Sequence, residues 1–143
     1  MATTTATISL NSQDITGDPL SLSKQATLTK AQEDVGLNQF TGITTLVYAS
    51  AQTATPLVLA ASYAGAADGS SNVVAHKVYI RNTSESSGDF INIEIGSSNV
   101  SLGRLYAGDW AFLPWDGHHD IDVDTSGALT IEFGVFSQSA VSA

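Results

Sequence analysis

The chain contains no cysteine and carries little charge of either sign. Without cysteine it has no disulfide framework, no thiolate nucleophile and no thiolate metal ligand. Only five of its 143 residues are lysine or arginine, against 14 aspartates and glutamates, so the formal net charge is −9. This balance argues against the basic face by which proteins bind nucleic acid, and against adsorption to anionic lipid.

Long apolar runs are also missing. The longest, Pro56 to Ala61, is far too short to span a bilayer. The N-terminus, MATTTATISL, lacks the basic region and apolar core of a signal peptide. We therefore expect no membrane partner, and synthesis in a cytoplasm. Serine, threonine, alanine, asparagine and glycine take the place of charge, which suits close packing against other proteins.

The strongest pattern is an alternation of apolar and polar residues between positions 73 and 136. A period of two places one set of side chains on each face of a pleated strand. Turn residues separate the runs, as in all-β sandwiches and barrels. No helix of ordinary length is expected. The four clearest runs are 78–80, 91–95, 121–123 and 129–135.

The N-terminal part carries a weaker form of the same pattern. Ile8 and Leu10 alternate with polar residues, and Leu20 to Leu28 places its apolar residues on one face. Lys24 interrupts that face, which indicates an edge position or a strand end. We assign residues 1–11 to an N-terminal arm and residues 12–143 to a single β-sandwich domain.

The acidic stretch at Asp120, Asp122 and Asp124 is the one that most resembles a metal site. A calcium loop of the EF-hand type needs glycine at its sixth position and glutamate at its twelfth, where this chain has Thr125 and Ile131. Carboxylates about 7 Å apart along a strand cannot all reach one ion without ligands from elsewhere. We favour a solvated acidic strand face over a divalent-ion site between subunits, and assign no metal ligand.

Two adjacent histidines, His118 and His119, precede that strand. On a strand they would point to opposite faces. The sequence also lacks the HExxH spacing of zinc enzymes. We therefore expect a turn with exposed imidazoles and not a zinc site.

The densest aromatic segment runs from Trp110 to Trp115, with Tyr106 and Phe136 as further aromatics. Such residues can stack on sugars, but a core or a subunit interface is the favoured interpretation. Trp110 and Phe112 share strand parity and are expected in the core. Trp115 follows a proline and precedes a turn, so we expect it to be partly exposed.

The sequence offers no catalytic constellation. It contains neither the G-x-S-x-G elbow of hydrolases nor a phosphate-binding loop. Glu94 and Glu132 lie on polar strand faces, but nothing in the sequence brings them together as a glycosidase pair. We expect no catalytic residue and no cofactor.

The order of motifs over about residues 8–136 resembles small virion proteins of tailed bacteriophages. In that group a strand ending in "RN" or "KN" is followed by a polar turn and a second apolar strand. A segment "L-x-x-G-[DE]" then leads into an aromatic strand, and a final strand carries "I-E-[FY]". The matching positions here are 80–82, 90–95, 105–109, 110–114 and 131–133.

The resemblance implies an antiparallel β-sandwich of jelly-roll type without catalytic residues. The group includes capsid and tail proteins, and we expect a non-enzymatic capsid decoration (cement) protein on the capsid surface, made in the host cytoplasm. Its expected partners are the major capsid protein and other copies of itself, with an N-terminal arm that extends to a neighbour. A tail or fibre component is one alternative, and a carbohydrate-binding module with Trp115 or Tyr106 exposed is another. A hydrolase is the weakest.

Overall fold

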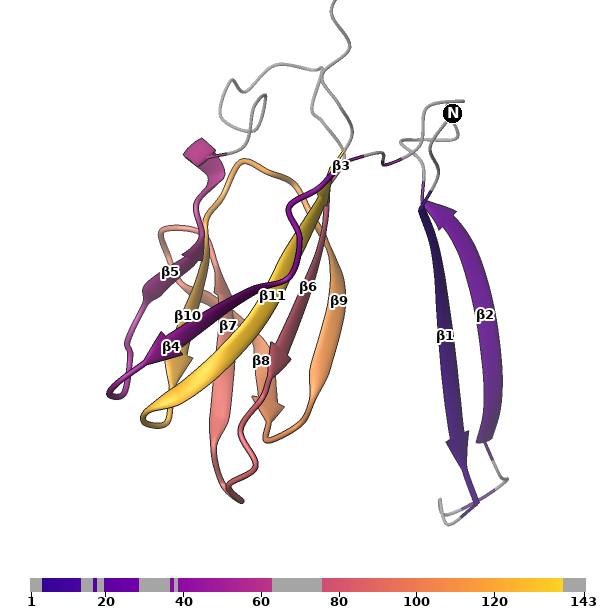
Figure 1. The fold of residues 1–143 in the computed structure, drawn as a ribbon, viewed down its shortest axis with the longest axis horizontal. Helices are drawn as coiled ribbons and strands as arrows, with labels where there is room; N and C mark the ends of the chain where they lie inside the picture. The colour runs from indigo at the N-terminus through magenta and orange to yellow at the C-terminus, as the bar shows by residue number, and fades with distance from the viewer. Residues whose placement is uncertain are drawn as a thin grey trace, which may run out of the picture.

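The computed structural model describes residues 4–13, 17, 20–28, 37, 39–62 and 76–137 (Figure 1). The described chain is built from strands, so the all-β prediction is confirmed. Its one helix is the 3-10 turn Ala60–Ser62, and no helix in this part of the chain is long enough to cross a membrane. The strands are β1 (Thr4–Ser12), β2 (Leu20–Leu28), β3 (Gln39–Phe40), β4 (Thr44–Tyr48), β5 (Thr55–Val58), β6 (His76–Asn82), β7 (Phe90–Ile95), β8 (Val100–Tyr106), β9 (Trp110–Trp115), β10 (Ile121–Thr125) and β11 (Leu129–Ser137).

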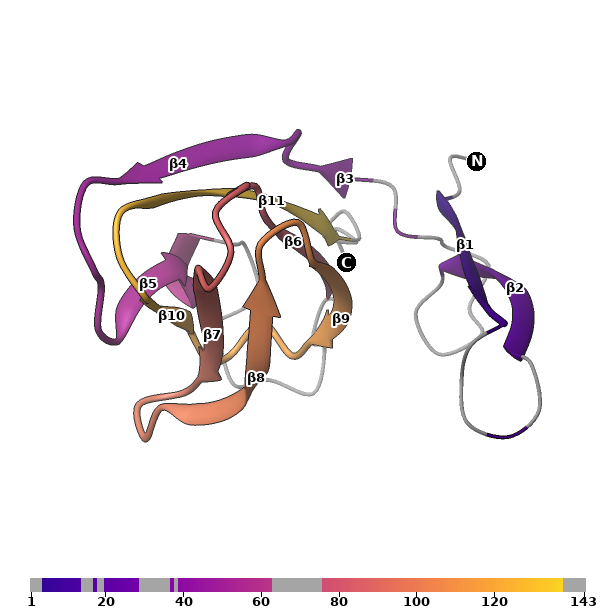
Figure 2. The same ribbon diagram turned by 90° about the horizontal axis from the view of Figure 1, so that it is seen from below.

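Two antiparallel sheets pack against each other to form the body of the molecule (Figure 2). One has the order β5-β10-β7-β8. The other has the order β3-β11-β6-β9, with β4 also paired to β11. Strand β4 pairs with β11, β5 with β10, β6 with β9 and β7 with β8. Strands β4 to β7 therefore pair with strands β8 to β11 in reverse order.

The alternating runs of the sequence supply the core between the two sheets. Val78 and Ile80 of β6 are fully buried, as are Ile91 of β7, Ile121 of β10 and Ile131 of β11. Each side chain of this size contributes roughly 1.5–3 kcal/mol when it is removed from water. The four runs identified in the sequence lie in β6, β7, β10 and β11, which confirms them as strands.

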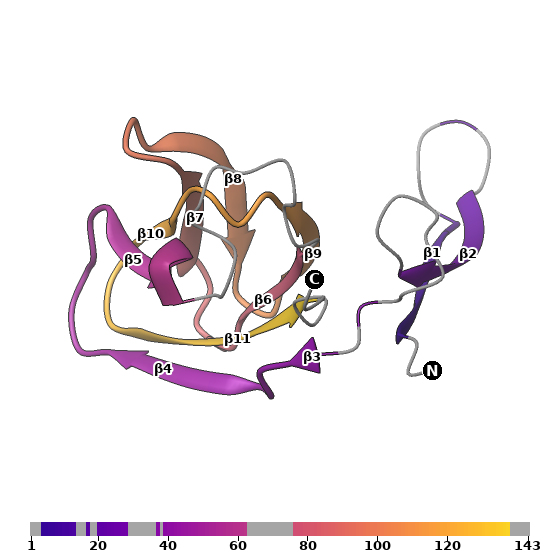
Figure 3. The ribbon, with the colours of Figure 1, turned by 90° about the horizontal axis from the view of Figure 1, so that it is seen from above.

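The N-terminal strands form a separate hairpin beside this body (Figure 3). Strands β1 and β2 pair with each other along their whole length and with no strand of the two sheets. The base of the hairpin is tied to buried Leu37, whose N–H donates to Leu28 O and whose carbonyl accepts from Thr4 Oγ1. The hairpin spans residues 4–28, so the predicted arm of residues 1–11 covers only one of its strands. The division at residue 11 stays a prediction.

Asn82 is a buried polar residue where three turns meet. Its Nδ2 donates to Leu105 O at 3.1 Å and to Asp89 O at 3.5 Å, and its Oδ1 accepts from Ser84 N at 3.0 Å. Its carbonyl accepts from Gly108 N, at a position whose φ of +84° favours glycine. The side chain thus connects the end of β6 to the start of β7 and to the end of β8, and the Asn82 carbonyl binds the β8–β9 turn.

We predict that Asn82→Ala destabilises the protein by about 2–3 kcal/mol, because buried backbone groups lose their partners and a small cavity forms. Chemical denaturation monitored by tryptophan fluorescence measures the change. Asn11→Ala is the matched control, since Asn11 is exposed on the hairpin, and it should stay within about 0.5 kcal/mol of the parent. Equal stability of the two variants would contradict this role for Asn82.

Candidate functional site

The hairpin has one apolar and one polar face. Cross-strand partners share a face, and the register pairs Ala6 with Ala26 and Leu10 with Leu22. Lys24, opposite Ile8, is the one charged residue on this face within the described residues. The opposite face carries only threonine, serine, glutamine and asparagine over the paired residues. The hairpin is therefore amphipathic, although no strand of the sandwich pairs with it.

The sheet that contains β9 has an aromatic outer face. Phe40 stacks on Phe136 with ring centroids 4.3 Å apart, and Phe112 meets Phe136 edge to face at 5.9 Å. The Phe40 ring covers Gly134, where an added Cβ would come within 2.6 Å of the ring. Tyr79 belongs to the same face and donates its hydroxyl to Glu132. These aromatic residues lie outside the core between the two sheets.

The predicted burial of both tryptophans was wrong, because Trp110 is exposed and Trp115 is buried. Trp110 is 54 % exposed and Phe112 is 37 % exposed, on the outer face and not in the core. Trp115 is buried, and its Nε1 donates to His119 O at 2.7 Å. The reason is the register: Ala111 and Leu113 pair with Ile80 and Val78, which fixes the inward positions of β9.

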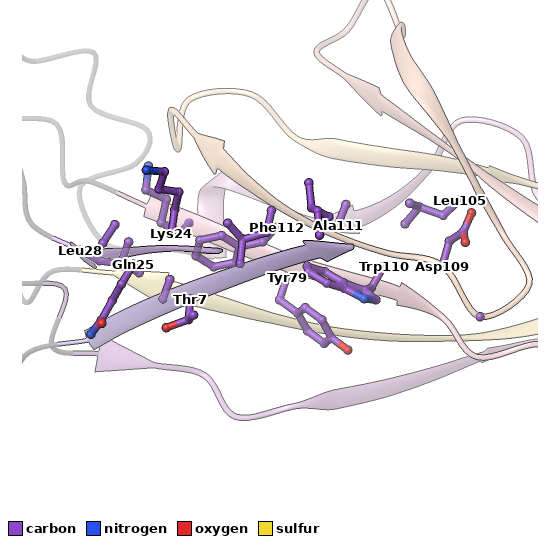
Figure 4. A pocket seen from close by; sticks show the side chains of 16 residues that line it. Thr7, Lys24, Gln25, Leu28, Tyr79, Leu105, Asp109, Trp110, Ala111 and Phe112 are labelled. Atoms are coloured by element: carbon purple, nitrogen blue, oxygen red, sulfur yellow. The ribbon is translucent and has the colours of Figure 1, made fainter. Parts of the chain in front are cut away.

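A groove of about 940 Å³ separates the apolar face of the hairpin from this part of the sandwich (Figure 4). Ile8 and Leu10 lie on one wall, and Trp110 and Phe112 lie on the other. Leu105 of β8 also lines it, so the groove reaches around the β9 edge to the neighbouring sheet. This groove is the candidate functional site, because ligand sites are typically concave and mostly apolar.

Basic residues gather around the groove. Lys24 and Lys77 line it from opposite walls, and Arg81 borders an adjoining hollow formed with Tyr79 and Trp110. Among the described residues the lining also holds the acidic Asp109, whose Oδ2 accepts a hydrogen bond from Tyr106 N at 3.0 Å. The described lining thus holds two lysines and one aspartate, in a chain whose net charge is −9.

The acidic strand is only partly solvated, unlike the face that the sequence predicts. Asp120 Oδ1 accepts from Ala60 N at 2.8 Å, and Asp124 Oδ1 accepts from Ala54 N at 2.7 Å. Both carboxylates therefore hold the chain around β5 against β10. Among the described residues, no three histidine, aspartate or glutamate side chains are grouped closely enough to hold a metal ion.

Glu94 and Asp122 form a cross-strand pair of carboxylates on β7 and β10. Glu94 Oε2 and Asp122 Oδ1 are buried and accept no hydrogen bond from the described chain. Burial raises the pKa of Glu94, and the nearby Asp124 and Asp122 carboxylates raise it further. Burial also raises the pKa of Asp122, with Asp120 adding to it. Ionisation of the Glu94 and Asp122 carboxyls therefore opposes folding.

The two histidines form part of a turn, as predicted. Asp116 Oδ1 accepts from the backbone N–H groups of His118 and His119, and Asp116 Oδ2 lies 2.7 Å from His119 Nδ1. Burial alone would raise the pKa of Asp116, but these hydrogen bonds and the His119 ring outweigh it and lower the pKa. The His119 side chain is more than half exposed.

The remaining candidates are dispersed over the surface. Tyr106 is half exposed on β8 and meets Phe90 edge to face. Glu94 and Glu132 lie in different sheets, each on the outer face, so the core separates them. They do not form a glycosidase pair. The groove itself was not predicted, and the alternation at Ile8 and Leu10 and the apolar face of residues 20–28 were the signals of it in the sequence.

Comparisons with known proteins add no assignment. No protein-family model, no curated protein and no solved structure matches this chain.

We predict that Glu94→Gln raises the melting temperature at neutral pH, because it removes a buried carboxylate from a like-charged cluster. A carboxyl pKa that is higher in the folded chain than in the unfolded chain costs stability as the pH rises through that interval. The gain should disappear below about pH 4, where the Glu94 carboxyl of the parent is protonated in both the folded and the unfolded chain. Differential scanning calorimetry across this pH range measures it.

Glu85→Gln makes the same chemical change at an exposed position and should leave the melting temperature unchanged. If Glu94→Gln lowered the melting temperature at neutral pH, the carboxylate cluster would be stabilising and our interpretation would be wrong.

Proposed function

We propose that this chain is a non-enzymatic structural protein of a tailed-phage virion, which decorates and stabilises the capsid through protein–protein contacts. The observation that carries the proposal is the amphipathic hairpin, whose apolar face is separated from its own sandwich by an open groove. A two-stranded hairpin is marginally stable in water unless its apolar face is packed. A neighbouring protein in an assembly would supply that packing.

We also infer that the sandwich is a jelly roll. The pairing of β4, β5, β6 and β7 with β11, β10, β9 and β8 supports this, as does the order β4-β11-β6-β9 in one sheet and β5-β10-β7-β8 in the other. Eight-stranded jelly rolls are common in viral capsid proteins, although lectins and cupins also use them. The fold therefore agrees with the virion proposal without requiring it.

The surface of the molecule favours packing against other subunits, including copies of itself. Large apolar side chains remain exposed on the hairpin and on both sheets, while charge is sparse. Contiguous exposed apolar surface marks interaction sites in soluble proteins. The exposed residues are Ile8, Leu10, Leu20, Phe40, Ile43, Val47, Leu59, Val100, Leu102, Tyr106, Trp110 and Phe112.

The mechanism is mechanical. The rigid sandwich rests on the capsid surface, and the hairpin of residues 4–28 acts as the arm that contacts the major capsid protein or a neighbouring copy. Such contacts exist only in the assembled shell, so they stabilise the shell selectively. A tail or fibre position would use the same contacts elsewhere in the virion. Immunogold electron microscopy of particles from the encoding phage distinguishes the two positions.

We predict that the double variant Ile8→Asp with Leu10→Asp loses capsid binding, because it places two charges on the apolar face of the hairpin. Cosedimentation with purified capsids of the encoding phage should fall by at least about tenfold. Ser9→Asp with Asn11→Asp is the matched control, since it adds charge to the opposite face of the same strand and should bind like the parent.

Deletion of residues 1–28 extends this test. We expect a soluble sandwich with an unchanged strand signal in circular dichroism and without capsid binding. If either the deletion or the Ile8 and Leu10 variant bound capsids with the affinity of the full chain, the hairpin would not be the contact we propose.

We predict a closed homo-oligomer in solution, because the exposed apolar side chains need a partner before capsids are available. Light scattering coupled to size exclusion measures the mass. A monomer at every concentration would contradict self-association.

Carbohydrate binding is a second candidate, favoured by the exposed Trp110 beside Tyr79 and Arg81 in the hollow next to the groove. Aromatic faces of this kind stack on sugar rings. A glycan site here would use Trp110, because Trp115 is buried and cannot contact a sugar. A glycan array with the parent chain and Trp110→Ala tests it: binding that the variant loses would support a glycan site, and no binding would exclude the glycans on the array.

A further inference from the structure

We propose that the groove between the hairpin and β9 binds an extended polypeptide segment in which apolar and acidic side chains alternate. The inference rests on the proposed assembly function, and it gives the chemistry of the segment that a capsid partner would present. Its source is an acidic segment of another protein and not a second copy of this chain.

The shape of the groove fits a single strand. Strand β9 is the last strand of its sheet and its one partner strand in the described chain is β6, so its outer backbone edge has no partner strand there from Trp110 to Leu113. The lining reaches from Tyr79 on the outer face around this edge to Leu105 on the other sheet. An open strand edge is a ready template for main-chain pairing with an extended peptide.

The two walls select the apolar side chains of the segment. Ile8 and Leu10 are each about two-fifths exposed on the hairpin wall, and Trp110 is more than half exposed on the sandwich wall. A strand inserted between them would cover both walls at once. Alternate side chains of a strand point in opposite directions, so every second residue of the segment would meet apolar surface.

The charges select acidic residues at the other positions. Lys24 and Lys77 come from opposite walls, and Arg81 borders the adjoining hollow. These are three of the five basic residues in the whole sequence. At physiological ionic strength charges are screened beyond about 8 Å. A bound segment would therefore respond to these cations, to Asp109 of the lining and to Glu132 opposite Arg81 more than to the net charge of −9.

The experiment uses the full chain and a labelled peptide of about ten residues, the length of a strand, with alternating valine and glutamate. A second peptide carries lysine in place of glutamate. We expect the acidic peptide to bind in fluorescence anisotropy, more weakly as salt rises, and the lysine peptide to bind at least about tenfold more weakly.

Two charge reversals locate the site. Lys77→Glu and Lys24→Glu should each weaken binding of the acidic peptide by about tenfold. Arg104→Glu is the matched control: it makes the same change in net charge on β8, where Arg104 lies over the Phe90 ring and does not line the groove. It should bind the peptide within about twofold of the parent.

Three outcomes would overturn the inference: equal binding of both peptides, equal loss in Lys77→Glu and Arg104→Glu, or no peptide binding by the parent chain. The parent chain could instead self-associate as its concentration rises, and Trp110→Ala could abolish this. That result would assign the groove to a second copy and would also overturn the inference. If the peptides fail while the hairpin variants still lose capsid binding, the assembly proposal stands and only the groove inference is wrong.

Discussion

The structure depends on the burial of one face of each strand in the body. Ile80, Ile91, Ile121 and Ile131 meet between the two sheets and are removed from water, and their strands are bonded along both backbone edges. Apolar burial of this kind is the largest favourable term in folding. Because the inner faces complete the core by themselves, the outer faces and the hairpin are free to carry apolar residues that the core does not need.

The strand content could be predicted from the sequence because alternation is a local signal. The runs that contain Ile91, Ile121 and Ile131 are strands in the structure, and the turn residues between them separate those strands. The order of the strands could not be predicted, since it depends on which edges meet, and a period of two carries no information about partners. The hairpin was predicted only as two strands, without their pairing.

The main error in the predictions was the side of the sheet on which each aromatic residue of β9 lies. Between Trp110 and Trp115 almost every residue is apolar, so alternation gives no phase to choose inward from outward positions. The phase is set by β6, whose Val78 and Ile80 pair with Leu113 and Ala111. The roles of Asp120 and Asp124 were missed for a similar reason, because the backbone amides that they bind lie far away in the sequence.

Asn82 restricts how this sequence can diverge. Its side chain uses both the amide donor and the carbonyl acceptor in a closed space. Aspartate has no donor and glutamine is longer, so neither can replace it, and Gly108 is fixed beside it by its positive φ. Valine, isoleucine and leucine, in contrast, substitute for one another in cores at modest cost. Distant kin would therefore be recognised by these two positions when overall identity has disappeared.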